Sequence, residues 1–197
     1  MYKKLLAALF LGFVLAGAVS AQDIEVDRYN ITAKVDLAGS AIDARASLEI
    51  SNVGSSPKDR LYLKLTKLAK ISAATINGVA ARVDSAEDRR VIVLNQVTLT
   101  PDAAIAPGAK AKVEISYRLE VPESTATASI TFGEVLMAPE EIWFPTPSTM
   151  FAMYGGVTAP VSLTVTGPAN APNFRAASAG VLKSDGGQTF SFDEPLN

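Results

Sequence analysis

Histidine and cysteine are both absent from the 197 residues of this sequence. Without cysteine the chain can form no disulfide and offers no thiol nucleophile, and without histidine it has no imidazole base. Serine–histidine and cysteine–histidine catalysis are therefore excluded for this chain alone. Zinc sites in proteins draw mostly on these two residue types, so the sequence does not predict a zinc site.

The sequence also lacks an excess of charge of one sign. It has 18 Lys and Arg against 20 Asp and Glu, which gives a net charge of −2. Nucleic-acid-binding proteins need a clustered excess of basic side chains, so this balance argues against a nucleic-acid partner. Apolar residues make up 48% of the sequence and charged residues 19%, which is typical of a folded globular domain.

Residues 1–21 have the pattern of a secretory signal peptide: two lysines near the start, an apolar run over 5–19, and small residues before Gln22. An uncleaved membrane anchor is the alternative interpretation. A spanning helix needs about 20 apolar residues, however, and this run is shorter. We therefore expect an exported protein, periplasmic or secreted, with no stable membrane span after cleavage and a single domain over residues 22–197.

Most of the remaining chain alternates between apolar and polar residues, which is the pattern of a β-strand with one buried face. Residues 29–37 and 42–50 alternate in this way and are joined by a short turn, which predicts an antiparallel hairpin. Asn77-Gly78 indicates a second hairpin, because both residues tolerate positive φ. Further strands are expected at 91–94 and 130–136. Short strands at this spacing, without a helical period, predict an all-β fold, an antiparallel β-sandwich.

Three groups of residues could carry chemistry, but each has a plainer structural interpretation. Ser55 and Lys58 have the spacing of serine–lysine acylases, yet such a pair needs a helix and a proline lies between them, which favours a solvated loop. The carboxylates of residues 84–88 could bind calcium, but their spacing is not that of an EF-hand, which favours a charged hairpin tip. Glu140 and Glu141 would point to opposite faces of a strand and could not cooperate as acid and base.

The densest group of aromatic and thioether side chains begins at Trp143, Phe144 and Pro145. It continues with Met150, Phe151, Met153 and Tyr154. Apolar side chains this dense, in a segment rich in proline and glycine, would be costly to leave in water, so they form either buried core or a partner interface. Trp143, Phe144 and Pro145 are the candidate docking or cleft-facing residues.

Several short patterns spread along the chain carry a family resemblance. They are Tyr29-Asn30-Ile31, residues 46–52, residues 61–65, Ile76-Asn77-Gly78, Pro107-Gly108, residues 113–117, Trp143-Phe144-Pro145 and residues 161–168. Taken together, residues 23–197 resemble the N-terminal β-domain of the aminopeptidase N (membrane alanyl aminopeptidase) family of zinc metallopeptidases. The resemblance rests on these patterns and on no catalytic signature.

In that family the domain is a saddle-shaped β-sandwich that packs on a catalytic domain and forms one side of the peptide cleft. The family's zinc-binding His-Glu-x-x-His lies in the catalytic domain, so the resemblance implies no catalytic, cofactor-binding or metal-binding residue in this chain. It implies a fragment or truncated product of a longer zinc aminopeptidase, with that catalytic domain or another protein as partner. The alternative is a stand-alone extracytoplasmic β-sandwich that acts as a binding or adhesion module.

Overall fold

The computed structural model describes residues 23–89, 91, 93–132, 134–147, 159–178, 180–186 and 188–194. The predicted signal segment 1–21 lies outside these residues, as does the part of the aromatic segment at 150–154. Over the described residues the regular elements are β-strands apart from one 3₁₀ turn, η1 (Pro139–Glu141), which confirms the all-β prediction. In the same part of the chain no helix has the length and apolar character needed to cross a membrane.

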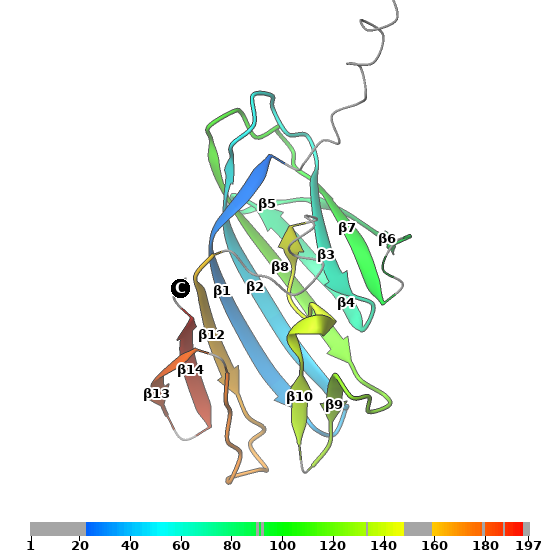
Figure 1. Cartoon of the computed structure of the whole chain (residues 1–197), viewed down its shortest axis with the longest axis vertical. Helices are drawn as coiled ribbons and strands as arrows, with labels where there is room; N and C mark the ends of the chain where they lie inside the picture. Colours follow the sequence, from blue (N-terminus) through cyan, green and yellow to red (C-terminus); the bar gives the residue numbers. More distant parts are fainter. Residues whose placement is uncertain are drawn as a thin grey trace, which may run out of the picture.

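The strands form a large sheet, a small sheet and a separate hairpin (Figure 1). The large sheet has eight strands, in the order β13 (Val181–Asp185), β14 (Thr189–Glu194), β12 (Val161–Thr166), β1 (Ile24–Asp36), β2 (Ala41–Asn52), β8 (Lys110–Glu120), β4 (Ala69–Ile76) and β5 (Val79–Ala80). The small sheet has four strands, in the order β11 (Thr146–Pro147), β3 (Leu61–Thr66), β7 (Leu94–Thr100) and β6 (Arg82–Glu87). The separate hairpin pairs β9 (Ala128–Ile130) with β10 (Val135–Met137).

The two hairpins expected from the sequence are present. In the first, β1 and β2 are antiparallel with Ile31 opposite Ala46, and the turn falls at residues 37–40. In the second, the turn joins β4 to β5, with φ of 53° at Asn77 and 80° at Gly78. Left-handed φ values at two consecutive residues suit asparagine and glycine, which explains why this dipeptide ends β4.

One pair of strands differs from the antiparallel prediction. Strands β1 and β12 run parallel, with Ile31 opposite Leu163 and Ala33 opposite Val165. The other strand pairs among the described residues are antiparallel. A parallel pair needs a long connection between its strands, so its direction depends on the path of the whole chain and not on the local alternation.

The large and small sheets share one apolar core. Leu48 and Ile115 of the large sheet are 0% exposed, as is Leu99 of the small sheet, and all three belong to the same packed cluster. Burial of each such side chain contributes about 1.5–3 kcal/mol. The facing apolar surfaces make this a β-sandwich and hold β1 and β2 firmly in place.

Two segments predicted as single strands have a different structure. The predicted strand at 91–94 is not one strand: Val93 lies in a turn and only Leu94 belongs to β7, and the Leu94 N–H donates to the Val91 carbonyl at 2.9 Å. The Asp88 carboxylate accepts from the Val91 N–H at 3.1 Å, so a side chain competes with strand pairing here. The predicted strand at 130–136 is instead the β9–β10 hairpin, whose turn interrupts the apolar pattern.

Arg118, on β8, ties this strand to the β1–β2 hairpin through two ion pairs. Its guanidinium nitrogens lie 2.7 Å from Asp36 and 2.8 Å from Asp43. The hydrogen bond from Arg118 holds the pKa of Asp36 below its ordinary value. The contribution of the Asp36 carboxylate to the stability of the fold is therefore present at neutral pH and is lost as the pH falls below about 4.

We expect Arg118→Gln to lower the melting temperature by no more than about 3 °C, because exposed ion pairs contribute little. The loss should shrink at high salt, which screens exposed charges. Thermal denaturation at low and high salt measures both effects, with Arg118→Lys as the variant that keeps the charge. A large loss that does not depend on salt would contradict this interpretation.

Candidate functional site

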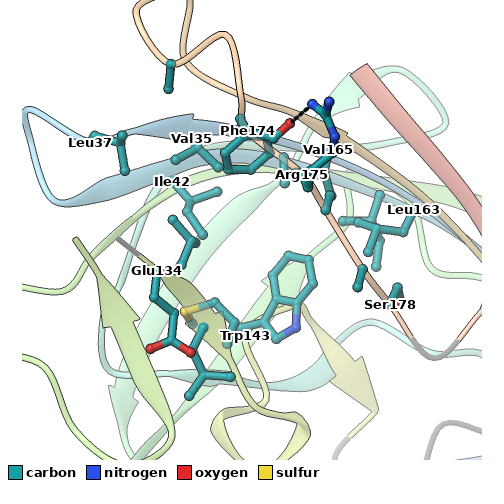
Figure 2. Close-up of a pocket in the computed structure, with 18 of the residues that line it drawn as sticks. Val35, Leu37, Ile42, Glu134, Trp143, Leu163, Val165, Phe174, Arg175 and Ser178 are labelled. Carbon is teal, nitrogen blue, oxygen red and sulfur yellow. Dashed lines mark hydrogen bonds between the residues drawn. The ribbon is translucent and has the colours of Figure 1, made fainter. Parts of the chain in front are cut away.

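A cavity of about 1050 Å³ lies between the large sheet on one side and β10 with Trp143 on the other (Figure 2). Its floor comes from β1, β2 and β12, its facing wall from β10 and Trp143, and its third side from residues 171–178. Protein interiors rarely leave voids much larger than one water molecule. Ligand pockets, in contrast, commonly measure about 300–1,000 Å³ and are mostly apolar.

The floor of the cavity is produced by the parallel pairing of β1 with β12. Alternate residues of the two strands face the same side of the sheet and line the cavity: Ile31, Ala33, Val35, Val161, Leu163 and Val165. Ala33 lies opposite Val165, and the short alanine side chain leaves room above the sheet at this point. Figure 2 shows Val35, Leu163 and Val165 on this side, facing Trp143 across the space.

The wall opposite is built on a strained residue. Ile142 has φ of 45°, in the left-handed region that β-branched residues rarely adopt. Such a conformation costs about 1–3 kcal/mol and persists only when its surroundings enforce it. Ile142 is 3% exposed, and its carbonyl accepts a hydrogen bond from the Thr66 N–H at 3.1 Å. The strained residue directly precedes Trp143, whose indole lies at the cavity (Figure 2).

The predicted docking segment is divided between the core and this cavity. Trp143 and Phe144 are half-buried and line the cavity, whereas Pro145 is buried. The Phe144 ring packs edge-on against Tyr29, at 5.6 Å between ring centroids, and against Trp143 at 5.2 Å. Aromatic edge-to-face pairs of this kind contribute about 0.5–1.5 kcal/mol beyond burial. The rings therefore fix one another, and their docking or cleft-facing role stays a prediction.

Six polar side chains are among those that line the cavity: Thr131, Glu134, Thr146, Asn173, Arg175 and Ser178. Thr146 is 3% exposed, and its Oγ1 has no hydrogen-bond partner among the residues that the structure describes. Glu134 and Arg175 are exposed, and Figure 2 shows them on different sides of the space. The Arg175 guanidinium donates to the Phe174 carbonyl at 2.8 Å. Thr146 is a polar side chain that sequence reasoning missed, because a threonine between two prolines, after two aromatics, carries no signal of burial.

The other chemical candidates do not form sites. Ser55 and Lys58 lie in a loop and not in a helix, and the Lys58 ammonium pairs with Asp23 at 2.7 Å. Of the suspected calcium ligands, Asp88 is buried against Lys64, and Glu87 pairs with Lys67 at 2.8 Å. Across the described ranges, no group of three or more His, Cys, Asp or Glu side chains could hold a metal ion.

Glu140 and Glu141 lie in η1, so the prediction that they belong to a strand is wrong. The Glu141 carboxylate accepts hydrogen bonds from the Thr127 hydroxyl at 2.5 Å and from the Thr66 hydroxyl at 3.4 Å. The hydrogen bonds of Glu141 thus hold the turn that leads into Ile142. This gives the residue a structural role beside the cavity wall.

No protein-family model matches the chain, and no curated protein matches its sequence. Solved structures match its fold. Yeast leukotriene A4 hydrolase in complex with bestatin matches with a TM-score of 0.62 and 14% identity, over 87% of this chain and 26% of that one. An M1 zinc metallopeptidase from Deinococcus radiodurans matches with a TM-score of 0.59 and 16% identity, over 87% of this chain and 39% of that one.

A two-domain M1 zinc metallopeptidase bound to L-arginine gives a TM-score of 0.58 at 17% identity, with 88% of this chain and 39% of that chain covered. This chain thus spans between 26% and 39% of the length of these three proteins. Identities this low carry the fold and nothing further. In fold, the chain is similar to the N-terminal β-domain of M1 zinc metallopeptidases.

Proposed function

We propose that this chain is a non-catalytic, exported N-terminal domain of an aminopeptidase N-like zinc metallopeptidase, in which it shapes a peptide cleft on a catalytic domain. The observation that carries the proposal is the unequal coverage: 87% of this chain matches 26–39% of larger proteins, one of them an M1 zinc metallopeptidase. A domain of such an enzyme can contribute by shape and charge alone. Its partner would supply the reacting groups.

The residues present do not fit the zinc ion of that family. The sequence has no histidine and no cysteine, and no cluster of carboxylates in the described part replaces them. Zinc sites need three or four such ligands in close contact. The proposal therefore places zinc and peptide hydrolysis in the partner domain and assigns no step of the reaction to this chain.

Trp143, Phe144 and Pro145 are proposed as the part of the chain that faces the partner domain or its cleft. Trp143 and Phe144 are held by ring contacts and by the constrained backbone at Ile142. Rigid aromatic side chains lose little conformational entropy on association, and for this reason they often dominate binding energy at interfaces. The segment is thus prepared for contact without needing to rearrange.

The test begins with the coding sequence around this gene, which should encode a domain with His-Glu-x-x-His. Co-purification of that domain with this chain, followed by titration, gives the dissociation constant. We expect Trp143→Ala to weaken association by at least about tenfold, as for an aromatic hot spot. Val53→Ala is the control, because Val53 is 57% exposed and lies outside both the segment and the cavity lining.

Two results would contradict the proposal. One is the absence of any such domain that associates with this chain. The other is cleavage of an aminoacyl reporter by the purified chain alone, which would show that it carries its own reaction. Unchanged affinity in Trp143→Ala would not contradict the role as a domain of a peptidase. It would show that Trp143 is not part of the surface that contacts the partner domain.

A second candidate function is a stand-alone extracytoplasmic binding module. The cavity beside Trp143 favours it, because a ligand-sized apolar hollow is not required of a domain that only supports another. A stand-alone module should fold cooperatively and stay monomeric with no peptidase partner. Urea unfolding and sedimentation of the purified chain measure both properties.

A further inference from the structure

We infer that Lys64 and Asp88 form a self-modification site, at which the folded chain converts their ion pair into an amide bond with loss of one water molecule. This inference goes beyond the proposed function, because both reacting groups belong to this chain and the reaction needs no partner domain. Three features of the structure carry it: the burial of both groups, the fixed orientation of the Asp88 carboxylate and a buried hydroxyl opposite Lys64.

The first feature is that both groups are removed from water. The Lys64 side chain is 0% exposed, the Asp88 side chain is 3% exposed, and Lys64 Nζ contacts Asp88 Oδ2 directly. In every other ion pair between described residues, both side chains are at least 17% exposed. A lysine amine is a nucleophile once it has given up its proton, and a site without water favours the uncharged form of both partners. The environment of this pair therefore favours the two forms that react.

The fold also holds the two groups in contact. Lys64 is fixed in β3, between β7 and β11, and the Asp88 N–H donates to the Leu94 carbonyl at 2.9 Å. Amide formation from an amine and a carboxylic acid is unfavourable in dilute water, but groups that a fold holds in contact reach effective concentrations of about 10⁵–10⁸ M. Burial also keeps water away from the product amide, so the reverse reaction lacks its second reactant.

The second feature is that the two oxygens of the Asp88 carboxylate have different partners. Oδ2 contacts Lys64, whereas Oδ1 accepts a hydrogen bond from the Val91 N–H at 3.1 Å. A backbone N–H in this position stabilises the negative charge that develops on Oδ1 when an amine adds to Cγ. Oδ1 is therefore placed to become the amide oxygen, and Oδ2 is placed to leave.

The third feature is the hydroxyl of Thr146. This residue lies opposite Lys64 in the antiparallel pair of β11 with β3, where Cβ atoms are typically about 4.5–5.5 Å apart. Thr146 is 3% exposed, and its Oγ1 has no hydrogen-bond partner among the described residues. A hydroxyl can accept one proton while it donates another, so it can pass a proton between Nζ and Oδ2. Gln96, opposite Lys64 on β7, adds no charge to the site.

The reaction balances without a further reactant. A proton first moves from Lys64 Nζ to Asp88 Oδ2, which leaves an amine beside a carboxylic acid. The Nζ lone pair then adds to Cγ, and the π electrons of the carbonyl move to Oδ1, where the Val91 N–H stabilises them. Thr146 Oγ1 accepts a proton from Nζ and donates its own to Oδ2, the Cγ–Oδ2 bond breaks, and water leaves as the carbonyl forms again. Of the three protons on the Lys64 ammonium, one stays on the amide nitrogen and two leave with Oδ2.

The experiment refolds the full chain from urea and follows its intact mass over time. The freshly folded chain should have the mass calculated from its sequence, because it holds the ion pair. We expect the mass then to fall by that of one water molecule, and proteolysis should yield linked peptides that contain Lys64 and Asp88. A chain that already lacks this water in urea has reacted during expression and supports the inference equally. Lys58 and Asp23 are the internal control, because their ion pair is 17% and 41% exposed and their peptides should stay separate.

Two variants identify the reacting groups. Lys64→Arg keeps a positive charge, but the guanidinium stays protonated and is not a nucleophile, so its mass should not change. Asp88→Asn exchanges the leaving group, because the amine then displaces ammonia instead of water and forms the same amide. The reacted Asp88→Asn chain should therefore reach the same final mass as the reacted wild type. A pair with only a structural role would leave Asp88→Asn at its calculated mass.

A third variant tests the path of the proton. Thr146→Val keeps the shape of the side chain and removes the hydroxyl, so the loss of water should be about 10²-fold slower. Thr75→Val is the matched control. It removes another buried hydroxyl without a described partner, on β4 in the large sheet, and the rate should be that of the wild type.

Circular dichroism shows whether each variant is folded, and Asp88→Asn remains informative if Lys64→Arg is not. A folded wild-type chain that keeps its calculated mass and yields no linked peptides would overturn the inference. Loss of water in folded Lys64→Arg would place the reaction at other residues and overturn it too. Equal rates in wild type and Thr146→Val would overturn the assigned path of the proton. None of these results depends on a peptidase domain, so they leave the proposed function to its own test.

Discussion

Replacing Lys64 with methionine is expected to lower the free energy of unfolding by about 3–5 kcal/mol. Lys64 lies in β3 with its side chain 0% exposed, and it forms an ion pair with Asp88, whose side chain is 3% exposed. Removing the lysine leaves the Asp88 carboxylate buried without its counter-charge. The cost of that unpaired charge dominates the effect, and the lost attraction adds to it. Urea unfolding at neutral pH measures the difference.

A second variant separates the unpaired charge from general damage to the core. Asp88→Asn in the Lys64→Met background removes the remaining charge and keeps an oxygen for the Val91 N–H, which Asp88 binds at 3.1 Å. We expect the double variant to recover most of the lost stability, because neutral replacements of buried ion pairs are often well tolerated. Lys70→Met is the surface control. Its ion pair with Glu120 is exposed and should contribute about 0–1 kcal/mol. If the double variant is no more stable than Lys64→Met, the unpaired-charge explanation is wrong.

Lys64 also illustrates what local sequence patterns leave out. Alternation in Leu61-Tyr62-Leu63-Lys64-Leu65 places the lysine on the face opposite the three leucines, yet Lys64 is as buried as they are. The pattern of β3 cannot indicate that this second face is covered too. The residues that cover this face are distant in sequence. Thr146 of β11 lies opposite Lys64, and Asp88, in the loop after β6, forms the ion pair with it. Local patterns predict which way a side chain points, and tertiary packing decides what it meets.

The same distinction separates the predictable parts of the fold from the rest. The β1–β2 hairpin and the Asn77-Gly78 turn follow from short-range rules, because alternation and turn chemistry act over a few residues. The parallel pairing of β1 with β12 does not, since residues far apart in sequence must meet. The cavity floor depends on that pairing. Trp143 and Phe144 could therefore be selected as candidates, whereas the hollow that they line and the buried Thr146 could not.

Raising the pH above about 10 is expected to unfold the protein, and two buried tyrosines account for much of the effect. Tyr29 is 2% exposed and Tyr117 is 3% exposed. Burial raises the pKa of both phenols above their ordinary value. In the unfolded chain both groups ionise near pH 10, but in the folded protein they keep their protons. The contribution of the two protonated phenols to the free energy of unfolding is therefore present in full below about pH 10. It is lost as the pH rises from there towards the pKa of the phenols in the folded state.

Each tyrosine should lower the free energy of unfolding by about 1.4 kcal/mol per pH unit above that point, so the pair gives about 2.7 kcal/mol per unit. Urea midpoints in a series of alkaline buffers measure this slope. Tyr117→Phe is the matched variant, because the Tyr117 hydroxyl is buried and has no hydrogen-bond partner in the described part of the chain. At neutral pH we expect this variant to be as stable as wild type or slightly more stable, by up to about 1 kcal/mol.

Above pH 10 the slope of Tyr117→Phe should be about half that of the wild type, since one of the two groups has been removed. An unchanged slope would instead assign the alkaline limit to lysine ion pairs such as Lys110–Asp27, where the hydrogen bond raises the pKa of Lys110. Tyr29 links this limit to the cavity, because its ring packs against Phe144 in the wall. The fluorescence of Trp143, the one tryptophan of the sequence, should therefore change over the same pH range in which the core opens, and not before it.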